Sequence, residues 1–492
     1  MKKPESRFKM LMRWSMWSRL DSRNLLKFLI IFNLILAIYQ ITSLHFIKPE
    51  SCLPVKSSAL ESNGNLKSIH FSSTEHGLTS RSQDTLNVIN SPRNLKAKSS
   101  FELSESNYLR HLSNPALSSQ SKWWTIENRT SYTVIKNYIP SENINLIDPD
   151  SVTLSTQGTY EFLYHVENLC KRWDGPLSVA VYAPGEDFLA SLHLIGFMGM
   201  CCDRCVRQNV SWHMIYDMRH GPKPEEIKFP AKLINYSEYD CSTPLEQMIS
   251  SYENTYRSGN KLPYPINVAR NVARLSVKTK YLLASDIELY PSLNIVSMFK
   301  KLLERERSSQ VPNINPRVPH VYVLPIFEVN TGLNPPLTKV QLNHMMKKKE
   351  AIFFHYWVCD ACQNFPDRKE WIDAIPADAS LNIFRVTQRL RSRSSWEPLY
   401  IGTNAEPLYE ERLTWDGKKD KMSQMFEMCL LNYDLLILDN AFLVHAPGIK
   451  RIDMKDQQKR LPFIKLNERT YKTIVSKLVK KYKSVNNRTL VC

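Results

Sequence analysis

The chain has 492 residues, of which 43% are hydrophobic and 23% charged, and its formal net charge is +17. This composition is enough to build a packed core, and it excludes a wholly disordered protein. The excess of positive charge suits a ligand that carries phosphate or carboxylate groups. The sequence has no aromatic RNA-binding signature and no arginine-rich repeat, so no nucleic-acid partner is expected.

The start of the chain predicts a membrane anchor. Residues 1–27 hold eight Lys or Arg against two acids and are predicted to be a cytoplasmic tail. Residues 28–47, FLIIFNLILAIYQITSLHFI, carry no formal charge over a length that matches the hydrocarbon thickness of a bilayer, about 30 Å. A buried soluble helix is the alternative. Because positive flanks stay in the cytoplasm, one N-terminal helix would cross the membrane with type II topology.

Residues 48–150 are predicted to be a flexible luminal stem. They are rich in Ser, Asn and Lys and contain few sustained apolar periods, so they cannot bury enough surface to offset the entropy of ordering. Part of this stretch, SKWWTIENRTSYTVI, is a candidate to pack on the folded head that follows.

The remaining residues, 151–492, predict one α/β domain. Short apolar runs typical of buried strands alternate with stretches of helical periodicity, which favours βαβ units and a mixed, mostly parallel sheet. The predicted helices span residues 159–173 and 266–278. The predicted strands span residues 177–183, 210–218, 278–289, 320–329 and 434–445.

Ten cysteines predict disulfides, because the chain beyond the anchor would lie in an oxidising lumen. Their connectivity stays open. Two CxxC pairs, Cys202 with Cys205 and Cys359 with Cys362, leave a zinc site or a redox motif as alternatives.

Four N-x-[ST] sequons fit the luminal assignment and are predicted N-glycosylation sites. They begin at Asn128, Asn209, Asn235 and Asn487.

The segment YLLASDIELYPS, Tyr281 to Ser292, predicts a strand that carries Asp286 and Glu288 at its carboxyl end. Ligands of open α/β sheets bind at this end of the strands, and residues i and i+2 of a strand share a face. Both carboxylates could therefore aim at one divalent cation. The alternative is the polar end of a buried strand.

The predicted helix before this segment carries Arg270, Asn271 and Arg274, with the two arginines on one face. We predict donor contacts from these residues, and a solvated basic face is the alternative.

Several motifs together resemble glycosyltransferase family 49. They include YPINVARNVARLSVKTKYLLASDIELYPS, VYVLPIFEV, and the stretch from Trp396 to Lys450 that ends in FLVHAPGIK. The similarity spans roughly residues 150 to 455, in order. It implies a GT-A fold, an inverting transfer from a UDP-sugar, UDP-glucuronic acid in the characterised members, and location in the Golgi membrane.

The resemblance also implies manganese or another divalent cation, held by Asp286, Glu288 and His445. Glu288 departs from the family's usual second Asp by one methylene, which puts donor preference in doubt. Hard oxygen-coordinated cations accept either acid, so activity is not excluded.

An inverting transfer needs a base for the acceptor hydroxyl. Glu411 is the preferred base and Glu410 the rival, both in LYEERL. Trp396, Glu397 and Arg412 are predicted to contact the acceptor, although Trp396 could instead fix the core and Arg412 could pair with the neighbouring acids. Tyr182 and Ala183 end the first strand of the domain and are predicted to meet the nucleotide through their backbone.

The expected function is therefore transfer of glucuronic acid to a glycoprotein glycan, such as a xylose-terminated O-mannosyl chain. A transferase that uses UDP-xylose or a UDP-N-acetylhexosamine is one alternative, and an inactive glycan-binding protein is another. Association with a second copy or with other Golgi transferases is left open.

Overall fold

A computed structural model describes residues 124–227, 239–250, 252, 254–308, 315, 317–374, 380–482 and 491–492. The predicted tail, the predicted membrane helix at 28–47 and the stem up to residue 123 lie outside this part, as do Asn235 and Asn487. Across the residues that are described, no helix is both long and apolar enough to cross a membrane.

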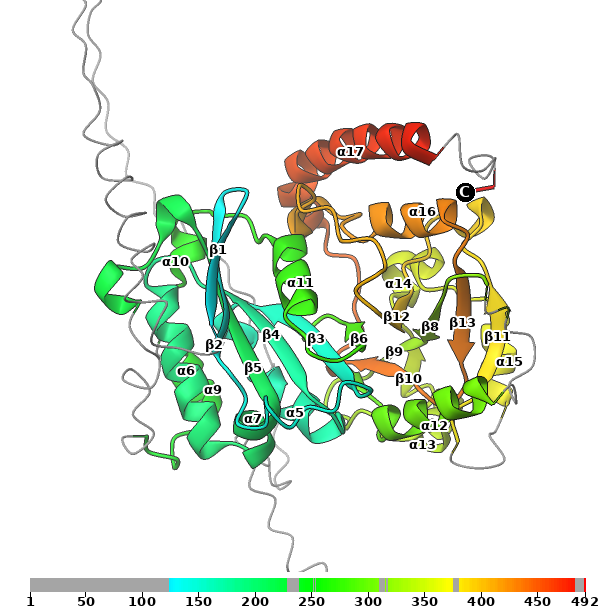
Figure 1. Ribbon diagram of the computed structural model, residues 1–492, viewed down its shortest axis with the longest axis horizontal. Coiled ribbons are helices and arrows are strands. Elements are labelled where there is room, and N and C mark those ends of the chain that lie inside the picture. The colour runs from blue at the N-terminus through cyan, green and yellow to red at the C-terminus, as the bar shows by residue number, and fades with distance from the viewer. Residues whose placement is uncertain are drawn as a thin grey trace, which may run out of the picture. The chain divides into compact units, whose positions relative to one another are not determined.

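The centre of the fold is a mixed ten-stranded sheet, which runs through both halves of the domain in Figure 1. β5, β4, β3 and β6 are parallel neighbours, as are β8 and β13, whereas the other neighbours are antiparallel. The α/β class and the mixed sheet are confirmed. The prediction that the sheet is mostly parallel is wrong, because five of the nine pairings in this sheet are antiparallel. The strands follow in spatial order: β1 (Thr125–Arg129), β2 (Tyr132–Ile139), β5 (Val210–Asp217), β4 (Leu177–Tyr182), β3 (Val152–Gly158), β6 (Tyr281–Ala284), β12 (Leu399–Gly402), β8 (His320–Leu324), β13 (Asp434–Leu438) and β11 (Ile383–Thr387).

Strand β4 is apolar except for Ser178, whose hydroxyl donates to the carbonyl of Ala273 (2.7 Å), because both of its faces are buried. Val179 and Val181 face one core with helix α6 (Asp187–Cys201), whereas Ala180 and Tyr182 face a second core with helix α11 (Ile266–Leu275). Successive side chains of a strand point to opposite faces, so a strand covered on both sides needs apolar residues on both faces. The half of the sheet around β4 is therefore the middle of three layers.

Three predicted strands are each divided into two shorter strands. The first parts, β6, β8 and β13, belong to the large sheet; the second parts are β7 (Leu289–Pro291), β9 (Ile326–Val329) and β14 (Leu443–His445). These three and β10 (Ala351–Phe353) form a second sheet in the order β10-β9-β14-β7. Pro325 breaks the run between β8 and β9 because it has no N–H for the ladder.

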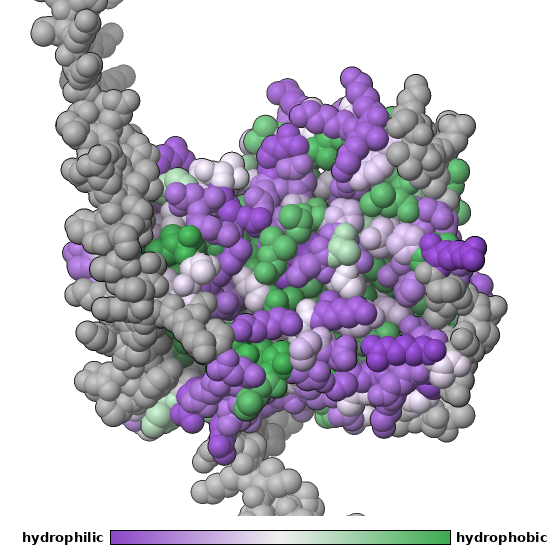
Figure 2. All heavy atoms as spheres, viewed as in Figure 1, coloured by the Kyte–Doolittle hydropathy of each residue, from purple (hydrophilic) through white to green (hydrophobic). Residues whose placement is uncertain are grey.

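The helices cover the two sheets. The predicted helix at 159–173 is a 3-10 turn followed by α5 (His165–Arg172), and α11 ends three residues before its predicted end. Figure 2 shows mostly hydrophilic side chains over the region of α17 (Met454–Tyr482). The Cys429–Cys492 disulfide links the C-terminus to α16 (Met422–Leu430). The remaining α-helices are α7 (Arg204–Asn209), α9 (Leu245–Ser250), α10 (Tyr256–Gly259), α12 (Ile295–Arg307), α13 (Lys339–Lys347), α14 (Tyr356–Cys359), α15 (Arg368–Asp373), α16 (Met422–Leu430) and α17 (Met454–Tyr482). The 3-10 helices are η1 (Tyr160–Phe162), η2 (Met218–His220), η3 (Pro224–Glu226), η5 (Asp360–Cys362), η6 (Arg391–Arg393) and η7 (Trp415–Gly417).

The folded domain begins earlier than predicted. β1 and β2 form a hairpin, and β2 pairs with β5, so residues from 124 onward belong to the sheet and not to a flexible stem. Val134 and Ile135 are fully buried in this hairpin. The expected boundary at residue 150 is too late because β-branched residues of the hairpin contribute to both cores.

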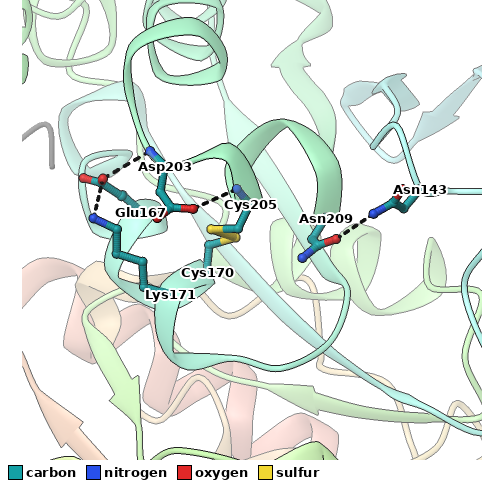
Figure 3. The surroundings of a disulfide bond; sticks show 7 residues. All are labelled: Asn143, Glu167, Cys170, Lys171, Asp203, Cys205 and Asn209. Carbon is teal, nitrogen blue, oxygen red and sulfur yellow. Dashed lines mark hydrogen bonds and ion pairs between the residues drawn. A yellow bond between two sulfur atoms is a disulfide. The ribbon is translucent and has the colours of Figure 1, made fainter. Parts of the chain in front are cut away.

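The prediction of disulfides is confirmed. Described cysteines are all in disulfides, and Cys359 pairs with Cys362. Cys205 does not pair with Cys202 but joins Cys170, which links α7 to α5 in Figure 3, and Cys201 joins Cys241.

The two described sequon asparagines lie in ordered structure. Asn128 is exposed on β1 and accepts a hydrogen bond from Thr133 Oγ1 (3.2 Å). Asn209 is half-buried, and its Oδ1 accepts from Asn143 Nδ2 at 3.2 Å, as Figure 3 shows.

Candidate functional site

The predicted ligands lie where the chain passes from one sheet to the other. Asp286 and Glu288 are in the turn between β6 and β7, and His445 ends β14. The predicted strand stops at Ala284, so the expectation that both carboxylates share one face of a strand is wrong. The turn instead gives the two side chains different partners.

Asp286 is held by two cations. Its Oδ1 accepts hydrogen bonds from Arg270 Nη2 (2.7 Å) and Gln157 Nε2 (3.2 Å), and its Oδ2 accepts from Lys421 Nζ (2.8 Å). Burial raises the pKa of Asp286, but Lys421 and Arg270 outweigh burial and lower it well below the usual range. The carboxylate is therefore fully ionised, and Arg270 is shared with Asp420.

Glu288 lies against His445. The Glu288 Oε2 atom is 3.1 Å from His445 Nε2 and 3.5 Å from Lys450 Nζ. Burial raises the pKa of Glu288, whereas the His445 hydrogen bond and the charge of Lys450 lower it to about 2. The additional methylene of Glu288 thus extends toward an imidazole.

One tautomer of the His445 ring can donate a hydrogen bond to the carbonyl oxygen of Ala446. Its Nδ1 lies 2.7 Å from the carbonyl oxygen of Ala446, which can only accept, so Nδ1 carries a proton. A neutral ring would then turn the Nε2 lone pair toward the Glu288 carboxylate. The Nε2 atom lies 3.1 Å from Glu288 Oε2, so these two atoms are close enough to bind one cation together.

Two further histidines and a glutamate surround this pair. Glu328 on β9 is fully buried, and its Oε1 accepts from the His355 backbone N–H (3.2 Å). Burial lowers the pKa of His355 to about 3, and the charges of Lys450, Lys421, His445 and Asp286 all act on it. The charged groups of both the Asp286 contacts and the Glu288 contacts therefore affect His355. Burial also lowers the pKa of His165 to about 4, and its Nδ1 lies 2.7 Å from Tyr290 Oη.

Polar side chains of helix α11 form hydrogen bonds to the loop at residues 403–409. Arg274 donates to the carbonyls of Thr403 (3.1 Å), Glu406 (3.1 Å) and Pro407 (3.0 Å). Asn271 Nδ2 donates to the carbonyl of Tyr409 (2.8 Å), and its Oδ1 accepts from the Tyr409 N–H (3.0 Å).

The donor contacts predicted for Arg274 and Asn271 are not supported, because these buried groups already bind the loop. The solvated-face alternative is wrong for the same reason. Only Arg270, through Asp286, reaches the predicted ligands.

The two predicted base candidates have unequal surroundings. Glu411 Oε1 accepts from Asn271 Nδ2 (2.9 Å) and lies 3.0 Å from Arg129 Nη1. Glu410 accepts two hydrogen bonds from Arg412, at 2.8 and 2.6 Å, and the bonds from Arg412 lower its pKa. Arg412 therefore pairs with the neighbouring acid in this structure.

Glu397 has the carboxyl group best suited to exchange a proton near neutral pH. Burial raises its pKa to about 7, with Lys421 and Arg270 acting to lower it and Asp420 and Asp286 acting to raise it. These four charges are those of the Asp286 cluster. The Glu397 carboxyl group is therefore within electrostatic range of the Asp286 cluster, and its contact with the acceptor stays a prediction.

The other predicted contacts are buried. Trp396 is 2% exposed and packs in the core with β8, β9 and β13, so it presents no ring face to a sugar; the core alternative holds. The side chains of Tyr182 and Ala183 are also buried, and the Ala183 N–H donates to the carbonyl of Ile215 (2.8 Å). A nucleotide could meet these two residues only through remaining backbone groups.

Sequence reasoning did not identify Lys421, Asp420 or Lys450 as site residues. Lys421 and Asp420 belong to the run DGKKDK, which has the composition of a solvated loop. The one available signal for Lys450 is its position five residues after His445.

A divalent cation fits part of this arrangement. Glu288 and His445 supply an oxygen and a nitrogen ligand that face each other, which is a donor set that manganese accepts. Asp286 is directed to Arg270 and Lys421 instead, and among the residues described no three His, Cys, Asp or Glu side chains converge as a metal site.

Fold and site together define the class of the protein: an α/β protein in which two carboxylates, a histidine and three cationic side chains meet where the chain leaves the central sheet. Residues 151–483 match the family described as "Glycosyl-transferase for dystroglycan". The chain belongs to this family of glycosyltransferases, as its resemblance to glycosyltransferase family 49 predicted.

Two curated relatives are similar over most of the domain. The chain is 30% identical to "Beta-1,4-glucuronyltransferase 1" of Danio rerio over 68% of this chain and 78% of that protein. It is 24% identical to "Xylosyl- and glucuronyltransferase LARGE2s" of Gallus gallus over 67% of this chain and 36% of that protein.

Among solved structures, "Crystal structure of GalNAc-T7 with UDP, GalNAc and Mn2+" aligns at a TM-score of 0.31 and 10% identity, covering 69% of this chain and 59% of that one. A TM-score of this size carries no argument.

Proposed function

We propose that this glycosyltransferase is an inverting, metal-dependent β-glucuronosyltransferase with a GT-A fold. It would move glucuronic acid from UDP-glucuronic acid to a glycoprotein glycan such as a xylose-terminated O-mannosyl chain. The names of the relatives support the donor sugar. The observation that carries the proposal is the Glu288–His445 pair beside Lys450, next to the Asp286–Arg270–Lys421 cluster.

The cations of the site suit a donor that carries two phosphates and a carboxylate. Lys450 is exposed and bonds Glu288 only weakly at 3.5 Å, so its ammonium group can turn to an incoming phosphate or carboxylate. Lys421 and Arg270 are more buried and keep Asp286 ionised. The structure thus supports recognition of an anionic donor.

Manganese would be held by Glu288 and His445, with Asp286 as the third proposed ligand. When bound, a divalent cation stabilises the negative charge that develops on a departing diphosphate. Lys421, which contacts Asp286, would offer its ammonium group to the diphosphate as a hydrogen-bond donor.

Inversion requires a base that removes the proton of the attacking acceptor hydroxyl. Glu411 remains the candidate that the sequence motif favours, with Glu410 as its rival. Glu397 is the candidate that the structure favours, because its carboxyl group responds to the charges around Asp286 and has a pKa of about 7. A base with this pKa is half deprotonated at neutral pH, which suits proton transfer under physiological conditions.

The proposed location is the Golgi membrane, with residues 28–47 as the anchor and the catalytic domain in the lumen. The charge pattern of residues 1–47 and the disulfides of the domain support it. Protease protection of the domain in sealed Golgi vesicles, together with a mass shift when N-glycans are removed, tests this topology. A domain digested in intact vesicles would refute it.

The function is tested with purified full-length protein in detergent. Release of UDP is measured for UDP-glucuronic acid, UDP-xylose and UDP-N-acetylhexosamines, with and without manganese and with and without a xylose-terminated acceptor. We expect acceptor-dependent and manganese-dependent turnover of UDP-glucuronic acid. Turnover of a different donor would replace the proposed sugar, and manganese-independent turnover would remove the metal from the proposal.

A further inference from the structure

Two adjacent aromatic side chains are exposed on α14. Tyr356 is 44% exposed and Trp357 is 51% exposed, and their rings meet edge to face with centroids 4.9 Å apart. The Arg451 guanidinium lies over the Trp357 ring at 5.4 Å. The contacts with the Tyr356 ring and with the Arg451 cation fix the orientation of the indole ring.

The backbone holds this pair in a rigid turn. His355 precedes the helix with a left-handed backbone (φ 58°), and its carbonyl accepts the N–H groups of Val358 and Cys359 (2.9 and 2.8 Å). The Cys359–Cys362 disulfide closes the turn, and Arg368 donates two hydrogen bonds to Asp360. Because this turn is already ordered, binding of a ligand to the two rings would cost little conformational entropy of the protein.

Two connections place the pair beside the Glu288–His445 site. On the N-terminal side, the Phe354 ring stacks on His445 (5.6 Å between centroids) and on His355 (3.8 Å). On the other side, Lys450 contacts Glu288, and the next residue, Arg451, covers Trp357. The aromatic pair is therefore joined by neighbouring residues to Glu288 and His445, two of the three proposed metal ligands.

The chemistry of the pair suits a saccharide. One face of a pyranose ring carries C–H groups that pack on an aromatic ring, while its hydroxyl groups accept hydrogen bonds from a guanidinium. A stable protein partner would need roughly 1,600 Å² of buried surface, far more than two rings provide. A platform of this size, bordered by charged residues, fits one or two sugar rings.

We propose that Tyr356 and Trp357 form an acceptor platform, on which Trp357 stacks against a sugar ring of the acceptor glycan. The proposal rests on the proposed function, since it names how the same site holds its second substrate. It also replaces Trp396, which is buried, with a tryptophan that is half exposed. Trp357 is a binding residue, and the donor does not contact it.

The test measures binding directly, so that it does not depend on turnover. Full-length protein is titrated calorimetrically with a xylose-terminated disaccharide in the presence of UDP and manganese. We expect Trp357→Ala to weaken binding about tenfold, equivalent to about 1.4 kcal/mol, and Trp357→Phe to retain most of the affinity. Affinity for UDP and the melting temperature should stay at their wild-type values, because the side chain is exposed.

Trp415 provides a matched control. It is 47% exposed and carries the Arg460 guanidinium at 4.3 Å, but it belongs to η7, which packs on α17. Trp415→Ala should leave disaccharide binding unchanged. Equal affinities of the wild type and Trp357→Ala, or equal losses in both alanine variants, would overturn the platform.

The outcomes separate the two proposals. If the wild type binds the disaccharide through Trp357 but transfers no sugar, the platform stands and the proposed function fails. If the wild type transfers glucuronic acid and Trp357→Ala keeps the same acceptor affinity, the function stands and the platform fails. A wild-type protein that neither binds nor transfers refutes both.

Discussion

Replacing Glu397 with Gln removes the carboxyl group that we consider best placed to accept the acceptor proton, while it preserves size and hydrogen-bonding capacity. The pKa of Glu397 is about 7 because burial penalises its charge and Asp420 and Asp286 repel it, with Lys421 and Arg270 compensating only in part. Removing a general base typically lowers the rate by about 10² to 10⁴-fold. We expect a loss of that size in kcat for Glu397→Gln.

The pH dependence gives a sharper readout than the rate alone. A base with a pKa near 7 is roughly one tenth deprotonated at pH 6 and mostly deprotonated at pH 8, so wild-type kcat/KM should rise about tenfold between these values. The assay is the initial rate of UDP release between pH 5.5 and 9. Glu397→Gln should lose the rise, because the remaining reaction no longer requires that deprotonation.

Glu411→Gln and Glu410→Gln test the two alternative candidates for the base. Glu411 bonds Asn271 and Arg129, and Glu410 bonds Arg412, so each substitution leaves a comparable amide in a polar setting. If Glu397→Gln keeps a rate within threefold of wild type and the same pH profile, the reasoning from burial is refuted. A loss confined to Glu411→Gln would return the base to the residue predicted from the sequence motif.

Three further predictions concern the ligands and the fold. Asp286→Asn should abolish manganese-dependent binding of UDP in calorimetric titrations, and undiminished binding would remove Asp286 from the site. Arg274→Ala should lower the free energy of unfolding in urea by about 3 kcal/mol, because it leaves buried carbonyls of the 403–407 loop unpaired; Arg274→Lys should not restore it, since an ammonium lacks the guanidinium fork. Burial lowers the pKa of His213 to about 3, and its Nδ1 accepts the Asn137 N–H (2.7 Å). The unfolded chain takes up a proton on His213 near pH 6.5 and the folded chain does not, so the free energy of unfolding falls as pH drops below 6.5. At pH 5 the loss is about 2 kcal/mol. A His213→Asn variant whose stability has the same pH dependence as that of the wild type would contradict this.

The part of the large sheet around β4, which helices cover on both faces, was predicted well from the sequence. Apart from Ser178, the run from Leu177 to Ala183 is apolar on both faces. The helix at Ile266 has a clear apolar stripe, so local pattern and tertiary environment agree in both elements. The split strands could not be predicted from pattern alone. A chain that bends from one sheet into another keeps the same apolar composition, and only Pro325 marks such a break locally.

Residue type and helical spacing also could not separate Arg270 from Arg274. Both are buried on the same side of α11, yet one binds Asp286 and the other binds loop carbonyls. The difference arises from the 403–421 segment, which is more than a hundred residues away in sequence. The same holds for Lys421 and Glu397, whose functional surroundings come entirely from long-range packing.

The turn between β6 and β7 limits the ways in which this site can be altered. Its ends are fixed: the Ser285 N–H donates to the carbonyl of Ser155, and Leu289 is paired with His445 across β7 and β14. An inserted or deleted residue would shift the register of β7 and exchange its buried and outward faces. A change of side-chain length, such as Glu for Asp at 288, alters the reach of a carboxylate and leaves that register intact. Engineering of donor preference in this enzyme should therefore vary the side chains of the turn and keep its length constant.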